Sequence, residues 1–325
     1  MGARILGTGS HVPAHCVTNV DLEQLVKTSE EWIVQRTGIR TRHILAEDEI
    51  PSDMSVHAGS LALEDARLQP RDVDLLLIAT NFPDMICPGS APFVANRLGL
   101  GDAPFFDLKA GCTGFVYGLA VADGLIRSGL YQHVLLIGAE ALSRVTDWTD
   151  RQTCVLFGDG SGAVLLGPGG KDEGVLGAAL YADAEKSLLL HMPGGGTRSP
   201  ANAETLAKRE HYLKMEGSGV FRNAAPMMER ATLDAVGAAD LTLSDIDWII
   251  PHQANIRIID ALTRRLGVPP ERVITNLDRV ANTSTASIPI ALDEALRDGR
   301  IQPGDVVVMT AFGAGVTYGA VILRI

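Results

Sequence analysis

The chain repeats a series of α/β segments, and this repeat restricts its possible folds more than any other feature. In each half, a helix end leads through a turn and an Asp-x-Asp into an apolar strand, and a Gly-rich turn later leads into a Val/Leu/Ile-rich strand. Three segments of residues 1–170 have counterparts in the same order: 63–81 with 233–255, 129–140 with 299–313, and 157–167 with 312–325. Chance could produce one such match, but three in order favour duplication. We therefore predict two α/β units, each built around a buried sheet.

The expected boundary between these units lies in the Gly- and Pro-rich stretch 168–174. It divides the chain into an N-terminal half, residues 1–170, and a C-terminal half, residues 171–325. Both halves alternate strand-like and helix-like apolar patterns, which is typical of α/β proteins.

Composition excludes several classes of protein. A net charge of −11 and a pI near 5.2 leave no global basic field to neutralise phosphates, so a nucleic-acid partner is not expected. No apolar run approaches the roughly 18 residues of a membrane span, and the first residues resemble a strand rather than a signal peptide. The four cysteines show neither CxxC pairing nor metal-ligand spacing. We expect a cytoplasmic protein that has no metal or other cofactor and no membrane partner.

Cys112 lies where one periodicity gives way to another. Phe105, Phe106 and Leu108 predict a short buried strand before it, and the apolar spacing of 115–126 predicts a helix after it. The start of a helix favours a thiolate, and the flanking glycines let a substrate carbonyl approach closely. The alternative is an inert buried thiol. On position alone, both interpretations stay open.

His252 and Asn282 lie at two further turns. His252 follows a predicted strand at 247–250 that Pro251 ends, and ligands of open α/β sheets bind at such strand ends. Asn282 precedes Thr283-Ser284 and an amphipathic run in which Pro289 either follows a helix start near Ile288 or bends the helix. A structural histidine and a helix N-cap are the alternatives.

Taken together, the segments resemble β-ketoacyl-acyl carrier protein synthase III, a thiolase-fold family of condensing enzymes. The resemblance covers the whole chain and includes GTGSHVP, EEWIVQRTGIRTRH (30–43), the Cys112 segment, PHQANIRII, NTSTASIP and the terminal AFGAGVTYGAVILRI. It implies a thiolase-like fold in which two duplicated α/β halves form α-β-α-β-α layers. It also implies the initiation of fatty-acid synthesis by decarboxylative condensation of an acyl-CoA with malonyl-acyl carrier protein, giving 3-ketoacyl-acyl carrier protein, CoA and CO2.

The resemblance assigns the catalytic triad to Cys112, His252 and Asn282. Cys112 would carry the acyl group, and the neutral His252 and Asn282 would donate hydrogen bonds to the enolate left by decarboxylation. The backbone N–H groups of Cys112 and Ala314 would form the oxyanion hole. Family members usually have glycine where this chain has Ala314, so the loop must accept a methyl group.

The resemblance also implies the surfaces that bind the substrates. The CoA-binding residues would be Trp32 and Arg151, which sandwich the adenine, together with Thr28, Arg36, Gly217, Phe221, Ala254 and Asn255. The acidic carrier protein would dock on Arg222, Gln253, Arg257, Arg264 and Arg265, because an acidic enzyme needs a local cationic patch for such a partner. Cys87 would reach across a homodimer interface and close the partner's acyl pocket, where many relatives have phenylalanine.

Other functions remain open at this point. A relative on the same scaffold could make a polyketide or quinolone-type product. A Cys-His-Asn thioester hydrolase is less compatible, because the aromatic neighbour of the papain-like cysteine is absent and a hydrolase must admit water. An inactive binding module is disfavoured by the presence of all three candidate catalytic residues.

Overall fold

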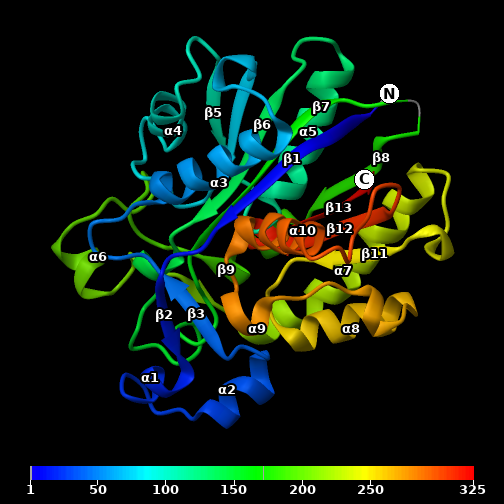
Figure 1. Ribbon diagram of the computed structural model, residues 1–325. Helices are drawn as coiled ribbons and strands as arrows, with labels where there is room; N and C mark the ends of the chain where they lie inside the picture. The colour runs from blue at the N-terminus through cyan, green and yellow to red at the C-terminus, as the bar shows by residue number, and fades with distance from the viewer. Residues whose placement is uncertain (1, 171) are drawn as a thin grey trace.

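Two large sheets organise the protein, and each is formed by one half of the chain (Figure 1). The computed structural model describes residues 2–170 and 172–325. In the first sheet, the strand order is β1-β7-β6-β4-β5; β4 is parallel to β5 and β6, and β7 is antiparallel to β6 and β1. Its strands are β1 (Ala3–His11), β4 (Leu75–Ala79), β5 (Phe105–Leu108), β6 (Val134–Glu140) and β7 (Gly160–Pro168).

The second sheet repeats this arrangement of strand directions. Its order is β8-β13-β12-β11, in which β13 is antiparallel to both neighbours and β12 is parallel to β11. A parallel bridge between Ile249 and Val273 lies beside β11, where β5 lies beside β4 in the first sheet. The strands are β8 (Gly174–Ala182), β11 (Trp248–Pro251), β12 (Val306–Gly313) and β13 (Thr317–Arg324). Duplication of one α/β unit would produce this shared order, although the division into two units stays a prediction.

Helices add three layers to the two sheets. Helices α5 (Gly114–Arg127) and α10 (Ser287–Arg297) pack between the sheets. Helices α3 (Pro51–Ala66) and α4 (Ala91–Leu98) cover the outer face of the first sheet. Helices α7 (Gly217–Ala238) and α8 (Ile256–Leu266) cover the outer side of the second (Figure 1). The layers therefore follow the predicted α-β-α-β-α order.

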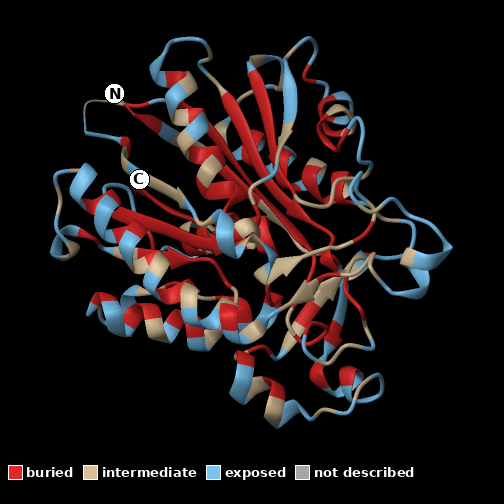
Figure 2. Cartoon of the chain, turned by 180° about the vertical axis from the view of Figure 1, so that it is seen from behind, coloured by how far each residue is buried: buried red, intermediate tan, exposed pale blue. Residues whose placement is uncertain are grey.

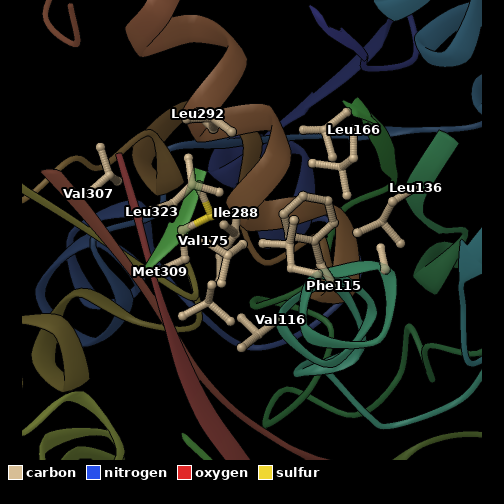
Figure 3. Packing of buried hydrophobic residues seen from close by; sticks show 14 of the residues in the cluster. Phe115, Val116, Leu136, Leu166, Val175, Ile288, Leu292, Val307, Met309 and Leu323 are labelled. Atoms are coloured by element: carbon tan, nitrogen blue, oxygen red, sulfur yellow. The ribbon is translucent and has the colours of Figure 1, made fainter. Parts of the chain in front are cut away.

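The middle layer forms the largest part of the core. Phe115 of α5 packs with Ile288 and Leu292 of α10 between the inner faces of the sheets (Figure 3), and Leu119 of α5 belongs to the same buried cluster. Burying a side chain as large as Phe115 contributes about 1.5–3 kcal/mol. The central strands β4, β6, β7, β12 and β13 are buried along most of their length, whereas the edge strands β5 and β8 are largely accessible and the outer helices expose one face (Figure 2). Because the core lies between the sheets, it fixes the two halves against each other.

The remaining elements lie near the strand ends. Two small sheets pair β2 with β3 and β9 with β10. These elements are β2 (His15–Thr18), β3 (Thr41–Ile44), β9 (Leu190–His191), β10 (Lys214–Met215), α1 (Asn19–Glu23), α2 (Glu30–Thr37), α6 (Ala203–Ala207) and α9 (Leu277–Val280).

Two expectations about local structure are decided by the fold. Helix α10 begins at Ser287, so Pro289 lies in its first turn, where it removes no intrahelical hydrogen bond. The predicted burial of Phe105 and Phe106 is wrong for the single chain, because their strand β5 is at the sheet edge and leaves them 45% and 44% exposed.

Candidate active site

One cavity of about 470 Å³ connects the predicted catalytic residues with the predicted CoA-binding surface. At its catalytic end lie Cys112, His252 and Asn282, all of them buried. We call the exposed end the mouth; there the wall includes Arg36, Phe221 and Arg257. The walls between the two ends are mainly apolar: Val155, Leu156, Phe157, Leu190, Met215, Val220, Ala224, Met228, Ile258 and Phe312. The structure thus brings together three residues that are widely separated in sequence.

Cys112 precedes α5 by two residues, as its sequence context predicts. Burial raises the pKa of its thiol to about 11, although hydrogen bonds from the Ser284 hydroxyl and the backbone N–H of Ala314 oppose this rise. The expectation that the helix start favours a thiolate is therefore not met in the resting protein, because burial outweighs these donors. Activation requires a group that accepts the thiol proton.

Two backbone N–H groups converge on the Cys112 sulfur. The N–H groups of Cys112 itself and of Ala314 both act to lower the pKa of the thiol by hydrogen bonding. Gly111, with φ +60°, and Gly313 permit this close approach, because a Cβ at either position would collide with backbone atoms of Ala314 or Cys112. Ala314 is not among the residues of positive φ in the described chain, so its methyl group requires no left-handed backbone.

His252 follows β11, and its ring is fixed in orientation. Its Nδ1 lies 2.7 Å from the Ser287 hydroxyl oxygen, which also accepts the Gln253 N–H at 3.4 Å. The Ser287 hydroxyl can donate to His252 Nδ1 while it accepts from Gln253, and in this arrangement the ring proton is on Nε2. Burial lowers the pKa of His252 to about 3, so the ring is neutral at physiological pH. It can present an uncharged N–H donor to the cavity.

Asn282 is held in place, and within residues 2–170 and 172–325 its side-chain nitrogen makes no hydrogen bond, so it can serve a ligand. Its Oδ1 accepts the Ser284 N–H at 2.9 Å, and its own backbone bonds to Leu156 and Gly158. Ala281 and Ser284 adopt φ values of 59° and 50°, a region that residues other than glycine rarely occupy and that often marks functional sites. Asn282 is not the N-cap of α10, since that position is Ala286. The alternative of a helix cap is therefore excluded.

Sequence reasoning missed three polar residues behind the predicted catalytic residues. Ser287 orients His252, and Ser284 lies 3.3 Å from the Cys112 sulfur and 3.2 Å from the Glu140 carboxylate. Glu140 ends the otherwise apolar strand β6 and is completely buried. A carboxylate at the end of a fully apolar strand was the signal that could have drawn attention to it.

Comparison with known proteins identifies the family. Two family models, described as 3-oxoacyl-[acyl-carrier-protein (ACP)] synthase III and its C-terminal part, match residues 106–184 and 236–325. A β-ketoacyl-[acyl-carrier-protein] synthase III of Desulfitobacterium hafniense is 50% identical over 98% of this chain and 97% of its own length. The chain belongs to the 3-oxoacyl-[acyl-carrier-protein] synthase III family.

Solved structures agree with this assignment. The synthase III of Aquifex aeolicus VF5 is 41% identical, with a TM-score of 0.92 and complete coverage of both chains. The priming β-ketosynthase of the R1128 polyketide pathway is 36% identical, with a TM-score of 0.92 over 100% of this chain and 96% of that one. The predicted family and thiolase-like fold are confirmed, and the synthase is an acyl-transferring condensing enzyme of fatty-acid synthesis.

The mouth of the synthase contains most of the predicted CoA-binding residues. Six of them line the cavity: Trp32, Arg36, Gly217, Phe221, Ala254 and Asn255. The side chain of Asn255 is already engaged, since its Oδ1 caps α8 and its Nδ2 donates to the Arg36 carbonyl at 3.1 Å. It therefore holds α2 against α8 at the mouth.

The predicted adenine sandwich is closed in this structure. The Arg151 guanidinium carbon lies 3.8 Å from the centroid of the Trp32 ring, so the two groups touch. An inserted base needs about twice the 3.5–4.0 Å contact distance between the groups. Arg151 Nε and the Thr28 hydroxyl are both buried, and neither has a hydrogen-bond partner among the residues that the structure describes. Arg151 must move before adenine can enter.

The predicted docking residues fall into two groups. Four of them are on α7 and α8: Arg222, Arg257, Arg264 and Arg265. The Arg257 guanidinium lies over the Phe221 ring at 5.0 Å from its centroid, and Arg265 forms an ion pair with Glu229 at 2.6 Å. The fifth residue is Gln253, and the prediction that it contacts the carrier protein is wrong. It is fully buried, where its amide donates to the Pro251 and Ile274 carbonyls and accepts the Asn276 N–H, so it cannot contact a carrier protein.

Cys87 lies outside this chain's cavity, on an exposed turn. Its neighbours Met85 and Ile86 are 54% and 88% exposed, and the edge strand β5 exposes Phe105 and Phe106.

Within residues 2–170 and 172–325, no helix has the length and apolar composition needed to cross a bilayer. The same residues contain no group of three His, Cys, Asp or Glu side chains arranged to hold a metal ion.

Proposed function

We propose that Cys112 is the acyl-carrying nucleophile of the synthase and that His252 and Asn282 stabilise the enolate formed from the second substrate. The reaction is the condensation of an acyl-CoA with malonyl-acyl carrier protein, which starts fatty-acid synthesis. The backbone N–H groups of Cys112 and Ala314 form the oxyanion hole.

In the first half-reaction, the Cys112 sulfur attacks the thioester carbonyl of acyl-CoA. Negative charge develops on the carbonyl oxygen and is stabilised by the N–H groups of Cys112 and Ala314. Expulsion of the CoA thiolate leaves the acyl group on the enzyme, which divides one difficult step into two easier ones.

In the second half-reaction, malonyl-acyl carrier protein loses CO2 and becomes an enolate. The Nε2–H of His252 and the amide of Asn282 donate to the enolate oxygen. Both donors are neutral, and the decarboxylation itself supplies the carbanion without a base. The carbanion then attacks the acyl-Cys112 carbonyl and expels the thiolate.

One observation carries this proposal: His252 and Asn282 each reserve one hydrogen-bond donor for the same cavity that Cys112 lines. The test combines acetyl-CoA with malonyl-acyl carrier protein and measures acetyl transfer to Cys112, CO2 release and 3-ketoacyl product. A product that is released as free acid, without CO2, would instead identify a thioester hydrolase.

A polyketide-priming synthase is the second candidate, supported by the similarity to the R1128 enzyme. Both candidates use the same catalytic residues, so the carrier protein distinguishes them. The synthase should prefer the carrier protein of fatty-acid synthesis over a polyketide carrier protein in kcat/KM. The reverse preference would favour the second candidate.

We further infer that acyl-CoA enters at the mouth and that the acidic carrier protein docks beside it. Trp32 and Arg151 provide flat surfaces for adenine once they separate, and Arg36 is the nearby cation. Arg257 and Arg264 on the exposed face of α8 offer positive charge to the acidic carrier protein.

We also propose a homodimer in which the β5 edges face each other. The exposed Met85, Ile86, Phe105 and Phe106 are apolar side chains that a partner subunit would cover. Cys87 of each subunit would then reach the partner's acyl pocket. A cytoplasmic location and independence from metals and other cofactors complete the proposal.

A further inference from the structure

A buried carboxylate lies two hydrogen bonds behind the Cys112 sulfur. Glu140 is fully buried at the end of β6, and its Oε1 accepts the Asn81 N–H at 3.1 Å and lies 3.2 Å from the Ser284 hydroxyl oxygen. The same hydroxyl oxygen lies 3.3 Å from the Cys112 sulfur. Cys112, Ser284 and Glu140 therefore form a continuous chain of hydrogen-bonding atoms.

The Ser284 hydroxyl has one proton and two neighbours that could accept it. When Glu140 is ionised, the carboxylate is the stronger acceptor, so the hydroxyl donates to Glu140 and its oxygen accepts the Cys112 S–H. This order gives a path S–H···O–H···O along which a proton can move from sulfur to carboxylate. Ser284 occupies the path with a φ of 50°, a backbone geometry that the surrounding structure must hold in place.

We propose that Glu140 accepts the Cys112 proton through Ser284 during acylation and returns it when the condensation releases the thiolate. This proposal rests on the nucleophilic role proposed above for Cys112. Glu140 acts through Ser284 and does not contact the substrate.

The steps balance in atoms and charge. As the sulfur bonds to the thioester carbon, its proton passes to the Ser284 oxygen, and the Ser284 proton passes to Glu140. CoA leaves as a thiolate and takes a proton from solvent at the mouth. In the second half-reaction, malonyl-acyl carrier protein loses CO2, the carbanion attacks the acyl-Cys112 carbonyl, and the departing thiolate recovers the proton from neutral Glu140 through Ser284.

The electrostatic environment is compatible with this exchange. Burial raises the pKa of Glu140 to about 7, so the carboxylate can both accept and return a proton near neutral pH. The polar groups that contact the Glu140 carboxylate are neutral: Thr80 and Asn81 after β4, and Ser284 and Thr285 before α10. The titratable Cys112 interacts with it only through space and through Ser284. His252 is the other nearby base, but burial lowers its pKa to about 3, which makes it a much weaker proton acceptor.

A purely electrostatic role for Glu140 predicts the opposite change in the acylation rate. The negative charge of Glu140 raises the pKa of the Cys112 thiol. Removing that charge would increase the thiolate fraction and accelerate acylation. The proposed relay predicts slower acylation for the same substitution, so the sign of the effect separates the two roles.

The test compares Glu140→Gln, Ser284→Ala and the control Thr80→Val in the full-length synthase. Thr80→Val removes a 3.5 Å contact to the other carboxylate oxygen of Glu140 and leaves the relay intact. Three rates are measured from pH 6 to 9: transfer of acetyl from acetyl-CoA to Cys112 by rapid-quench mass spectrometry, alkylation of Cys112 by iodoacetamide, and CO2 release from malonyl-acyl carrier protein.

For the wild-type protein, we expect the acetyl-transfer rate to rise with pH and level off above about pH 7, as Glu140 ionises. Glu140→Gln and Ser284→Ala should lose that plateau and transfer acetyl about 10²-fold more slowly at pH 7, the lower range for general-base catalysis. Alkylation of the Gln variant should be no slower than wild type, and CO2 release should be retained. Thr80→Val should keep the wild-type profile.

Wild-type acetyl transfer in both relay variants would overturn the proposal. Parallel loss of acetyl transfer, alkylation and CO2 release would also overturn it, since that pattern marks a structural residue. If Glu140→Gln does not fold, Ser284→Ala alone decides, because it interrupts the path without changing the carboxylate. Failure of the nucleophilic role is distinct: the wild-type protein itself would then transfer no acetyl group to Cys112.

Discussion

The catalytic end and the mouth of the same cavity hold their polar groups in different ways. At the catalytic end, His252 and Asn282 are buried, uncharged at neutral pH and each fixed by a hydrogen bond to a neighbour. At the mouth, Arg36 and Arg257 are exposed and their guanidinium groups rest on aromatic rings. Solvent screens charges at the exposed mouth much more than it weakens the hydrogen bonds of the buried donors.

This difference predicts which substitutions should reduce activity most. A donor fixed in a buried site is already oriented when charge develops on the substrate, so its removal should strongly reduce the reaction rate. Exposed charges attract a partner over a distance and can replace one another in part. The predictions below test this contrast, beginning with the largest expected effect.

Cys112→Ser should abolish acetyl transfer from radiolabelled acetyl-CoA. A serine hydroxyl is a far poorer nucleophile than a thiol at neutral pH, even beside an acceptor of its proton. CO2 release from malonyl-acyl carrier protein should persist, because both enolate donors remain. Retention of covalent label on the variant would place the acyl group on another residue.

Asn282→Ala should reduce CO2 release by about 10²–10³-fold, the usual cost of removing one oxyanion donor. Acetyl transfer to Cys112 should continue, because Asn282 does not take part in it. His252→Ala should behave in the same way. Decarboxylation by Asn282→Ala at the wild-type rate would contradict the assignment of the enolate donors.

Cys87→Phe should lower kcat/KM for octanoyl-CoA by about 10-fold or more relative to acetyl-CoA. A larger side chain from the partner subunit would shorten the acyl pocket, and such steric discrimination is worth about 1–3 kcal/mol. Equal effects on both primers would show that Cys87 does not line the pocket.

The double change Arg257→Glu and Arg264→Glu should raise KM for malonyl-acyl carrier protein by about 10-fold and leave acetyl transfer nearly unchanged. Added salt should likewise raise the KM of the wild-type enzyme for malonyl-acyl carrier protein, because it screens exposed charge. The control for net charge is Arg4→Glu, an exposed position at the start of β1, away from α8 (Figure 1). It is compared with the single change Arg257→Glu, because the two substitutions alter the net charge equally. An equal rise in KM for this control would indicate a general effect of net charge rather than docking.

The smallest expected effect concerns pH. Between pH 5.5 and 8, CO2 release by Cys112→Ser should vary by less than about threefold, because His252 has a pKa near 3 and stays neutral over this range. A steep fall as pH decreases through 6.5 would mean that His252 titrates as an ordinary exposed histidine. The catalytic end would then be wetter than its burial indicates.

Much of the fold follows from local sequence. The change of periodicity around Cys112 and the Pro251 stop before His252 correctly predicted a residue just ahead of α5 and one just after β11. Strand and helix periods, glycine turns and proline stops act over a few residues, so they can be recognised without the rest of the chain. The recurrence of these signals in order also predicted α/β units around buried sheets, whereas the layered arrangement was implied by the family resemblance.

Other features depended on contacts between residues far apart in sequence. Gln253 lies one position from His252 and was assigned to carrier-protein docking, yet packing turns its amide toward Pro251, Ile274 and Asn276. Phe105 and Phe106 have the pattern of buried residues, but the position of β5 at the sheet edge exposes them. A strand's own sequence does not state whether it is central or at an edge, because that depends on which other strands pair with it.

The catalytic residues illustrate the same division. Sequence and family resemblance predicted that Cys112, His252 and Asn282 belong together. Only the tertiary structure showed the closed contact of Arg151 with Trp32 and the link from Cys112 through Ser284 to Glu140, residues separated by 172 and 144 positions. A serine or glutamate carries no local sign of such a link, because its hydrogen-bond partner is selected when α5, β6 and the segment before α10 pack together.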